Sequence, residues 1–260
     1  MHVRFGNNLD EANALTLLGT IALRRDDLEG AKTHLESARA IFVRTGNSLG
    51  EANVLEVLGR LALRRDDLEG AKTFLEASRT IVAQIGQSLG EANVLQTLGT
   101  LALRRDDLES AKTFLENARA IHVRIVEKLG EANTLFLVGL VLTQEDTAKA
   151  ELTLAEALGK YRELNERWGI AQTELRLAQI AAARGDPSRL APATAQLLDL
   201  ETRDQMQLAG PGWRDFCASL LEHDPERHQA LREAARASWT AIGALGLVRE
   251  MLDFKIEIRP

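Results

Sequence analysis

The stretch LGEANVLQTLGTLALRRDDLESAKTFLENARAI, at Leu89–Ile121, decides the fold, because it holds two apolar patterns of helical period around one polar turn. Small and apolar residues recur every three or four positions on both sides of the RRDD segment. These residues are Ala92, Leu95, Leu98, Gly99 and Ala102 before the turn, and Leu108, Ala111, Leu115, Ala118 and Ile121 after it. Such spacing predicts two amphipathic helices joined by a short turn, which is a helical hairpin.

This hairpin pattern recurs with a period of 40 residues, since related LxEAN segments begin at Leu9, Leu49, Leu89 and Leu129. The first three units share the RRDDLE turn, the fourth has TQED in its place with one residue deleted, and a weaker fifth copy begins at Gly169. One hairpin cannot bury both of its faces, so the units must stack. We therefore predict an all-α solenoid.

The predicted units are numbered from the LxEAN segments. They cover residues 9–48, 49–88, 89–128, 129–168 (divergent) and 169–204 (weak), followed by a divergent C-terminal hairpin and capping helix at 205–260. Residues 1–8 align with the end of a unit, so we interpret them as the tail of a truncated preceding repeat. This alignment favours a fragment of a longer protein over a natural start codon.

The helix boundaries carry capping signals. Ser48 with Glu51, and Ser88 with Glu91, have the spacing of a capping box. Asp106, like its copies at positions 26 and 66, is predicted to cap the second helix of its unit.

Glycine marks two of the junctions between units. Gly46 and Gly86 stand where a helix commonly ends in a left-handed residue, whereas the junction at Val126 lacks this signal. A glycine also recurs inside each first helix, at positions 19, 59, 99 and 139. Because glycine costs a helix about 1 kcal/mol relative to alanine, its recurrence there predicts close packing.

The composition excludes several function classes. The net charge is −6, with 32 basic and 38 acidic residues, which argues against a nucleic-acid partner. The single cysteine, Cys217, excludes an intrachain disulfide and is expected to be a buried thiol. No signal peptide, transmembrane run, phosphate loop, paired histidine motif or catalytic constellation is present. We expect a cytoplasmic protein that is not an enzyme and needs no cofactor, metal or membrane.

The small positions of the unit resemble the tetratricopeptide repeat. Leu95, Leu98 and Gly99 match its first-helix positions, and Ala111 and Ala118 match the small positions of its second helix. The unit is longer than the standard 34 residues and lacks the common tryptophan and tyrosines. It is similar to the 40-residue variety of scaffold proteins and of the sensor regions of large signalling ATPases. The resemblance covers residues 9–168, extends more weakly to about residue 200, and implies a right-handed superhelix.

The resemblance also implies that the first helices line a concave, ligand-binding surface. The candidate ligand-facing residues are Asn13, Asn53, Asn93 and Asn133, Arg24, Arg64 and Arg104, and Arg60, Gln96, Thr100 and Phe136. An asparagine amide can donate and accept at once, so the asparagine column can hold an extended backbone; the alternative is a local hydrogen bond near the helix terminus. The first arginine of each pair can bind a carboxylate, or else form a solvated ion pair.

Two further expectations concern the same surface. The second arginine of each pair, such as Arg105, is expected to stay solvated at the turn. Phe136 and Leu140 make the inner face of the fourth unit apolar, either as a specificity pocket or as packing under the fifth unit.

We interpret the chain as a protein–protein interaction module. It would bind a peptide or partner protein with acidic groups in its groove, as an adaptor or as the recognition region of a larger protein. One alternative is a structural module that self-associates through its exposed N-terminal face and leaves the groove idle. Another is a sensor region for a small ligand.

Overall fold

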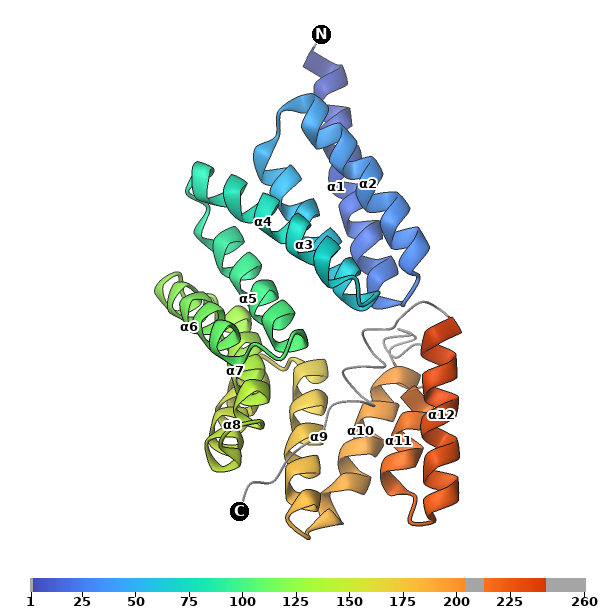
Figure 1. Cartoon of the computed structure of the whole chain (residues 1–260). Helices are drawn as coiled ribbons and strands as arrows, with labels where there is room; N and C mark the ends of the chain where they lie inside the picture. Colours follow the sequence, from blue (N-terminus) through green and yellow to red (C-terminus); the bar gives the residue numbers. More distant parts are fainter. Residues whose placement is uncertain (1, 204–212, 242–260) are drawn as a thin grey trace.

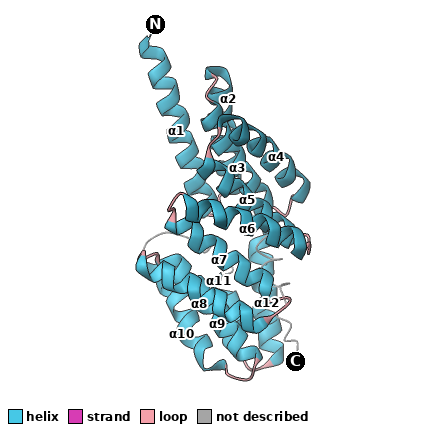
Figure 2. Cartoon of the chain, turned by 90° about the vertical axis from the view of Figure 1, so that its left-hand side faces the viewer, coloured by secondary structure: helices cyan, strands magenta, loops and turns pink. Residues whose placement is uncertain are grey.

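The computed structural model describes residues 2–203 and 213–241. Over these residues the chain forms twelve α-helices and one 3-10 helix, and no strand occurs among them (Figure 2). In chain order they are α1 His2–Arg24, α2 Leu28–Thr45, α3 Ser48–Arg64, α4 Leu68–Ile85, α5 Ser88–Arg104, α6 Leu108–Arg124, α7 Lys128–Leu142, α8 Thr147–Glu163, α9 Arg167–Ala183, η1 Pro187–Arg189, α10 Leu190–Arg203, α11 Trp213–Leu221 and α12 Pro225–Ala241. The predicted all-α class is confirmed.

Successive helices pack as hairpins, and the hairpins stack. The helices α1 and α2, α3 and α4, α5 and α6, and α7 and α8 pair, and the second helix of each pair contacts the first helix of the next. Figure 1 shows these pairs following one another along a curved path from the blue N-terminal hairpin. The first helices α1, α3, α5 and α7 also contact one another in that order, so they share one surface of the solenoid.

Inside each hairpin, the recurrent glycine meets a buried leucine. A Cβ placed on Gly99 would lie 2.6 Å from Leu115 Cγ, and one placed on Gly59 would lie 2.7 Å from Leu75 Cδ2. Both leucines are fully buried. The predicted close packing at these glycines is confirmed, because no larger residue fits without displacing a core side chain.

A left-handed residue ends the second helix of each of the first three units. Gly46 and Gly86 have φ values of 69° and 66°, as predicted, and make room for the chain to reverse. At the next junction Val126 occupies the same place with φ 59°, between the end of α6 and the start of α7. The junction therefore forms without the glycine that favours it.

The predicted N-caps are wrong by one residue. Asp107 caps α6, since its Oδ1 accepts a 3.0 Å hydrogen bond from the Ser110 amide, whereas Asp106 has φ 59°. The copies behave alike: Asp27 and Asp67 are the caps, and Asp26 and Asp66 have positive φ. One left-handed residue completes the reversal between the two helices, so the residue after it becomes the cap.

The same displacement applies at the start of the first helices. Asn47 caps α3 in place of Ser48, and its Oδ1 accepts a 2.8 Å hydrogen bond from the Gly50 amide. Gln87 caps α5 in place of Ser88. The predicted capping boxes are therefore wrong, because each left-handed glycine is followed directly by the cap.

Each RRDD turn connects the two helices of its own hairpin, and in the second and third units arginines of this turn also contact the preceding hairpin. Arg65 donates to Leu28 O at 2.9 Å and to Glu29 Oε1 at 2.7 Å, both in the turn of the preceding unit. Arg105 makes the same two contacts one unit later, to Leu68 O and Glu69 Oε1. The expectation that the second arginine stays solvated is therefore wrong: stacking brings the preceding acidic turn within reach of its guanidinium.

The first arginine of the pair takes part as well. Arg64 Nε lies 3.2 Å from Asp26 Oδ1, whose side chain is almost fully buried. We call these bonds between the arginines of one unit and the Asp-Asp-Leu-Glu turn of the preceding unit the arginine–turn contacts. They accompany the packing of one hairpin on the next.

At the C-terminal end, α11 and α12 pack against each other. Phe216 and Trp239 are fully buried, with ring centroids 6.0 Å apart. Cys217 is a buried free thiol, as predicted. The capping helix predicted after α12 and the start of the C-terminal unit lie at 242–260 and 204–212, outside the described residues.

Candidate binding groove

A groove of about 640 Å³ crosses the surface shared by the first helices. It takes residues from the C-terminal end of α1, the C-terminal half of α3, the length of α5 and the N-terminal half of α7. The groove thus runs diagonally over the stack, because each hairpin is displaced and rotated relative to the one before it.

Nine of the eleven candidate residues line this groove. They are Arg24, Arg60, Arg64, Asn93, Gln96, Thr100, Arg104, Asn133 and Phe136. Asn13 and Asn53 are exposed but do not line it. Both stand near the N-terminal ends of α1 and α3, which the diagonal path does not reach.

The groove is chemically polarised. Arg24, Arg64 and Arg104 are the last residues of α1, α3 and α5, and Arg60 lies one turn before the end of α3. On α7, by contrast, the lining includes the apolar side chains of residues 129, 136 and 137. A ligand therefore meets cationic groups along one edge, beside Leu23 and Leu63, and mainly apolar side chains with Glu127 at the α7 end.

The four lining arginines differ in their partners. Arg64 forms an ion pair with the buried Asp26 of the preceding unit, so the charge of Arg64 is already neutralised within the protein. Arg60 is 4.0 Å from Glu56, which also accepts a 2.8 Å hydrogen bond from Thr97 Oγ1. Arg24 is exposed and has no partner among the described residues. Arg24 and the half-exposed Arg60 are the arginines best able to bind a ligand.

Two lining amides lie beside hydroxyl groups. Asn133 Oδ1 accepts from the Tyr161 hydroxyl at 2.8 Å, and Gln96 Oε1 lies 3.2 Å from the Thr134 hydroxyl, which donates to Gly130 O at 2.7 Å. With its carbonyl oxygen engaged, the amide NH₂ of Asn133 remains available to donate to a ligand carbonyl. Asn133 therefore bonds to a neighbouring helix, not to its own terminus.

The lining also includes residues that are absent from the candidate set, among them Glu56, Tyr161 and Gln172. Tyr161 is the only tyrosine in the chain, and this rarity is the one sequence feature that could have marked it as a candidate site residue. Burial, aided by the charge of Glu166, raises the pKa of Tyr161, so it stays protonated and donates to Asn133. Leu140 is buried, and its place in the lining is taken by Leu137.

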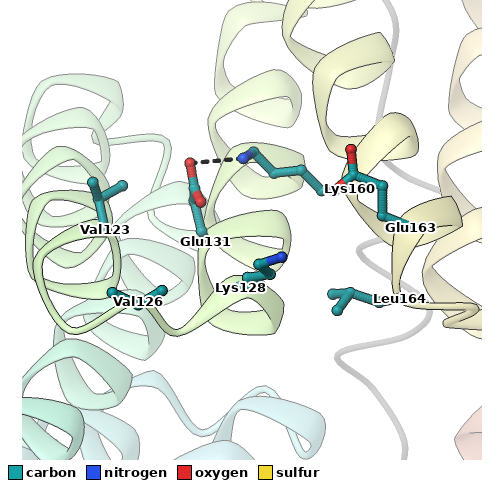
Figure 3. Close-up of a pocket in the computed structure, with 7 residues that line it drawn as sticks. All are labelled: Val123, Val126, Lys128, Glu131, Lys160, Glu163 and Leu164. Carbon is teal, nitrogen blue, oxygen red and sulfur yellow. Dashed lines mark ion pairs between the residues drawn. The ribbon is translucent and has the colours of Figure 1, made fainter.

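A second, smaller cavity of about 150 Å³ lies where α6, α7 and α8 meet (Figure 3). Val123, Val126 and Leu164 form its apolar wall, and Lys160 pairs with Glu131 at 3.0 Å. Two of its charges thus neutralise each other. The larger groove offers unpaired donors and is the better binding site.

Two properties of the described part of the chain concern membranes and metal ions. None of its helices is both long and apolar enough to cross a bilayer. Within the same residues, no group of three or more histidine, cysteine, aspartate or glutamate side chains could hold a metal ion.

The stacked hairpins and their groove define an α-solenoid repeat protein. Residues 10–84 match the family model of the tetratricopeptide repeat. This match identifies residues 10–84 as tetratricopeptide repeats, which in general terms supports a protein-interaction module. No curated protein matches the sequence.

Two solved structures share the fold. The Rap conjugation gene regulator of the plasmid pLS20, in complex with the Phr* peptide, has 14% identity and a TM-score of 0.74 over 95% of this chain. This chain spans only 66% of that regulator. BtubC (BKLC) from P. vanneervenii has 17% identity and a TM-score of 0.56, over 77% of this chain and 91% of its own.

Proposed function

We propose that the protein binds an extended, acidic segment of a partner protein in the groove across α1, α3, α5 and α7. The observation that carries the proposal is the polarised lining: arginines along one edge, amide donors between the edges, and apolar side chains on α7. An extended segment presents backbone carbonyls to the amides of Gln96 and Asn133 and a carboxylate to Arg24 or Arg60.

The available donors support recognition of both the backbone carbonyls and the carboxylates of the bound segment. Gln96 and Asn133 lie on consecutive first helices, α5 and α7, so they can meet successive parts of one extended chain. Phe136 and Leu137 then accept an apolar side chain of the ligand. The solenoid that is solved with a bound peptide shares this fold, which is consistent with peptide capture.

The test is selection of peptides from a random display library on the full chain, followed by affinity measurement on variants. We expect selected peptides to carry Asp or Glu and at least one large apolar residue. Arg60→Glu should weaken their binding by tenfold or more, since one charge-assisted contact contributes about 1.5–3 kcal/mol. Arg44→Glu, on the outer helix α2, is the matched control and should change nothing.

The asparagine column provides a second matched pair. Asn93→Ala removes an amide that lines the groove, whereas Asn53→Ala removes its copy one unit earlier, outside the groove. Weaker binding for Asn93→Ala alone supports the groove. Equal affinities for both variants, with selected peptides that lack acidic residues, would refute the proposal.

A further inference from the structure

On one edge of the stack, where consecutive units join, lies an uncharged hollow of about 480 Å³. Its apolar lining comes from Leu49 at the start of α3, Ile85 at the end of α4, Leu89 at the start of α5 and Ile125 just after α6, and residues 86–88 complete it. None of these described lining residues carries a charge. The hollow therefore offers a ligand only apolar and neutral polar contacts.

The apolar side chains of this hollow are open to solvent. Ile85 is 43% and Leu89 is 41% exposed, and Leu49 is exposed to a similar degree. Within the described residues, the opposite edge of the stack, at the RRDD and TQED turns, has no exposed large hydrophobic side chain. A Cβ on Gly86 would meet nothing within 4 Å, so the space beside this residue is open. Exposed apolar side chains gathered on one edge in this way mark an interaction surface.

The hollow and the binding groove share a wall. Leu89 lines both, and from there the groove follows α5 through Asn93, Gln96 and Thr100 to Arg104. Leu89 and Arg104 stand fifteen positions apart in this helix, which corresponds to about 22 Å along its axis. The groove thus has arginines at one end and, across the Leu89 wall, an uncharged apolar hollow at the other.

We infer that a segment bound in the groove continues across Leu89 and places an uncharged apolar cluster in the hollow. The inference rests on the groove function proposed above and adds the chemistry of the ligand, which is acidic at the arginine end and apolar at the other. Because an extended chain advances about 3.3 Å per residue, about six to eight residues separate these two ends.

The charges of the groove and of the hollow set the direction of the segment. A carboxylate in the hollow meets no cation among the described lining residues and loses its hydration, which is costly. At the other end, Arg24 and Arg60 supply cations with which a carboxylate pairs. An apolar cluster has the opposite preference, since contact with Leu49 and Ile85 removes apolar surface of both molecules from water.

The test uses the full chain and peptides selected on it from a random display library, which at about 16 residues are long enough to span both surfaces. Ile85→Ser alters the hollow alone, because Ile85 does not line the groove, and Leu49→Ser is a second variant of the same kind. Leu152→Ser is the matched control, since Leu152 is an exposed leucine of α8 that lines neither surface. Arg60→Glu tests the groove by itself.

We expect selected peptides to carry an acidic residue and an uncharged apolar cluster about six to eight residues apart. Ile85→Ser and Leu49→Ser should each weaken their binding by about three- to tenfold, and Leu152→Ser should leave it unchanged. Replacing the apolar cluster of the peptide with serines should cost affinity on the unaltered chain, but should not add to the loss that Ile85→Ser causes.

Three results would overturn the inference. If Arg60→Glu weakens binding but neither Ile85→Ser nor Leu49→Ser does, the groove binds the peptide and the hollow does not. If Ile85→Ser weakens binding and Arg60→Glu does not, the groove proposal itself fails, and the continuation of the segment with it. Sedimentation of the free chain as a dimer that Ile85→Ser dissociates would assign the hollow to a second copy.

Discussion

Val126 adopts a backbone conformation that its side chain disfavours. Its φ of 59° matches the left-handed glycines at positions 46 and 86, and a β-branched residue is strained there. Because Val126 is 75% exposed, removing its side chain gives up little burial. We predict that Val126→Gly raises the free energy of unfolding by about 1 kcal/mol, measured by urea denaturation.

The reverse change is the control for this prediction. Gly86 has the same conformation, and a Cβ built on it meets nothing within 4 Å, so Gly86→Val introduces backbone strain alone. It should lower the free energy of unfolding by about 1 kcal/mol. If both variants shift stability in the same direction, the left-handed conformation is not the cause.

His122 places an imidazole in a core position of the stack. The copies of this position in the first two units hold Phe42 and Val82, and all three are buried. Neither ring nitrogen makes a hydrogen bond within the described structure, and Nδ1 is 3.6 Å from Glu127 Oε2. Burial lowers the pKa of His122 below its usual 6.5, outweighing the opposite effect of Glu127 and Glu131.

This position predicts a pH dependence of stability. Since the pKa of His122 is lower in the folded state, the unfolded chain binds the proton first as the pH falls. The stability contribution is therefore complete above pH 6.5 and is lost as the pH falls from there toward the folded-state pKa. His122→Phe should make the free energy of unfolding less dependent on pH in this range, and should raise it by about 1–2 kcal/mol at neutral pH. An unchanged slope between pH 5 and 7 would contradict the assignment.

At the scale of the element, replacing a glycine inside a helix by alanine should have opposite effects on stability, depending on the side chains packed around it. A Cβ on Gly99 of α5 would collide with Leu115, whereas one on Gly159 of α8 meets nothing within 4 Å. We predict that Gly99→Ala destabilises the fold by about 1–3 kcal/mol through overpacking, despite its gain in helix propensity. Gly159→Ala should stabilise it by up to about 1 kcal/mol. Thermal denaturation of both variants measures this, and stabilisation by Gly99→Ala would show that the hairpin is loosely packed.

At the scale of the whole molecule, stability should vary along the stack. Among the described residues, α3 packs on α2, α4 and α5, whereas the main contacts of α1 are with α2 and α3. In a solenoid, each unit is stabilised by its neighbours, so an end helix opens more readily. Hydrogen exchange should be about tenfold faster at Leu17–Ile21 than at Val57–Leu61, and uniform exchange would indicate a single cooperative unit.

The sequence alone determined the repeat architecture. The 40-residue period, the two helical patterns in each unit, the left-handed Gly46 and Gly86 and the close packing at Gly99 depend on local spacing and on nearest neighbours within a hairpin. The closely similar units repeat these interactions, so the sequence of one unit is enough to predict them in the others.

Tertiary structure decided how the units meet. The bonds of Arg65 to the preceding turn and the placement of Asn53 outside the groove both depend on the rotation between hairpins. A periodic sequence places equivalent residues on equivalent helix faces, but it does not specify that rotation. The curvature of the stack arises from packing between units, and it selects which copies of each residue converge on the groove.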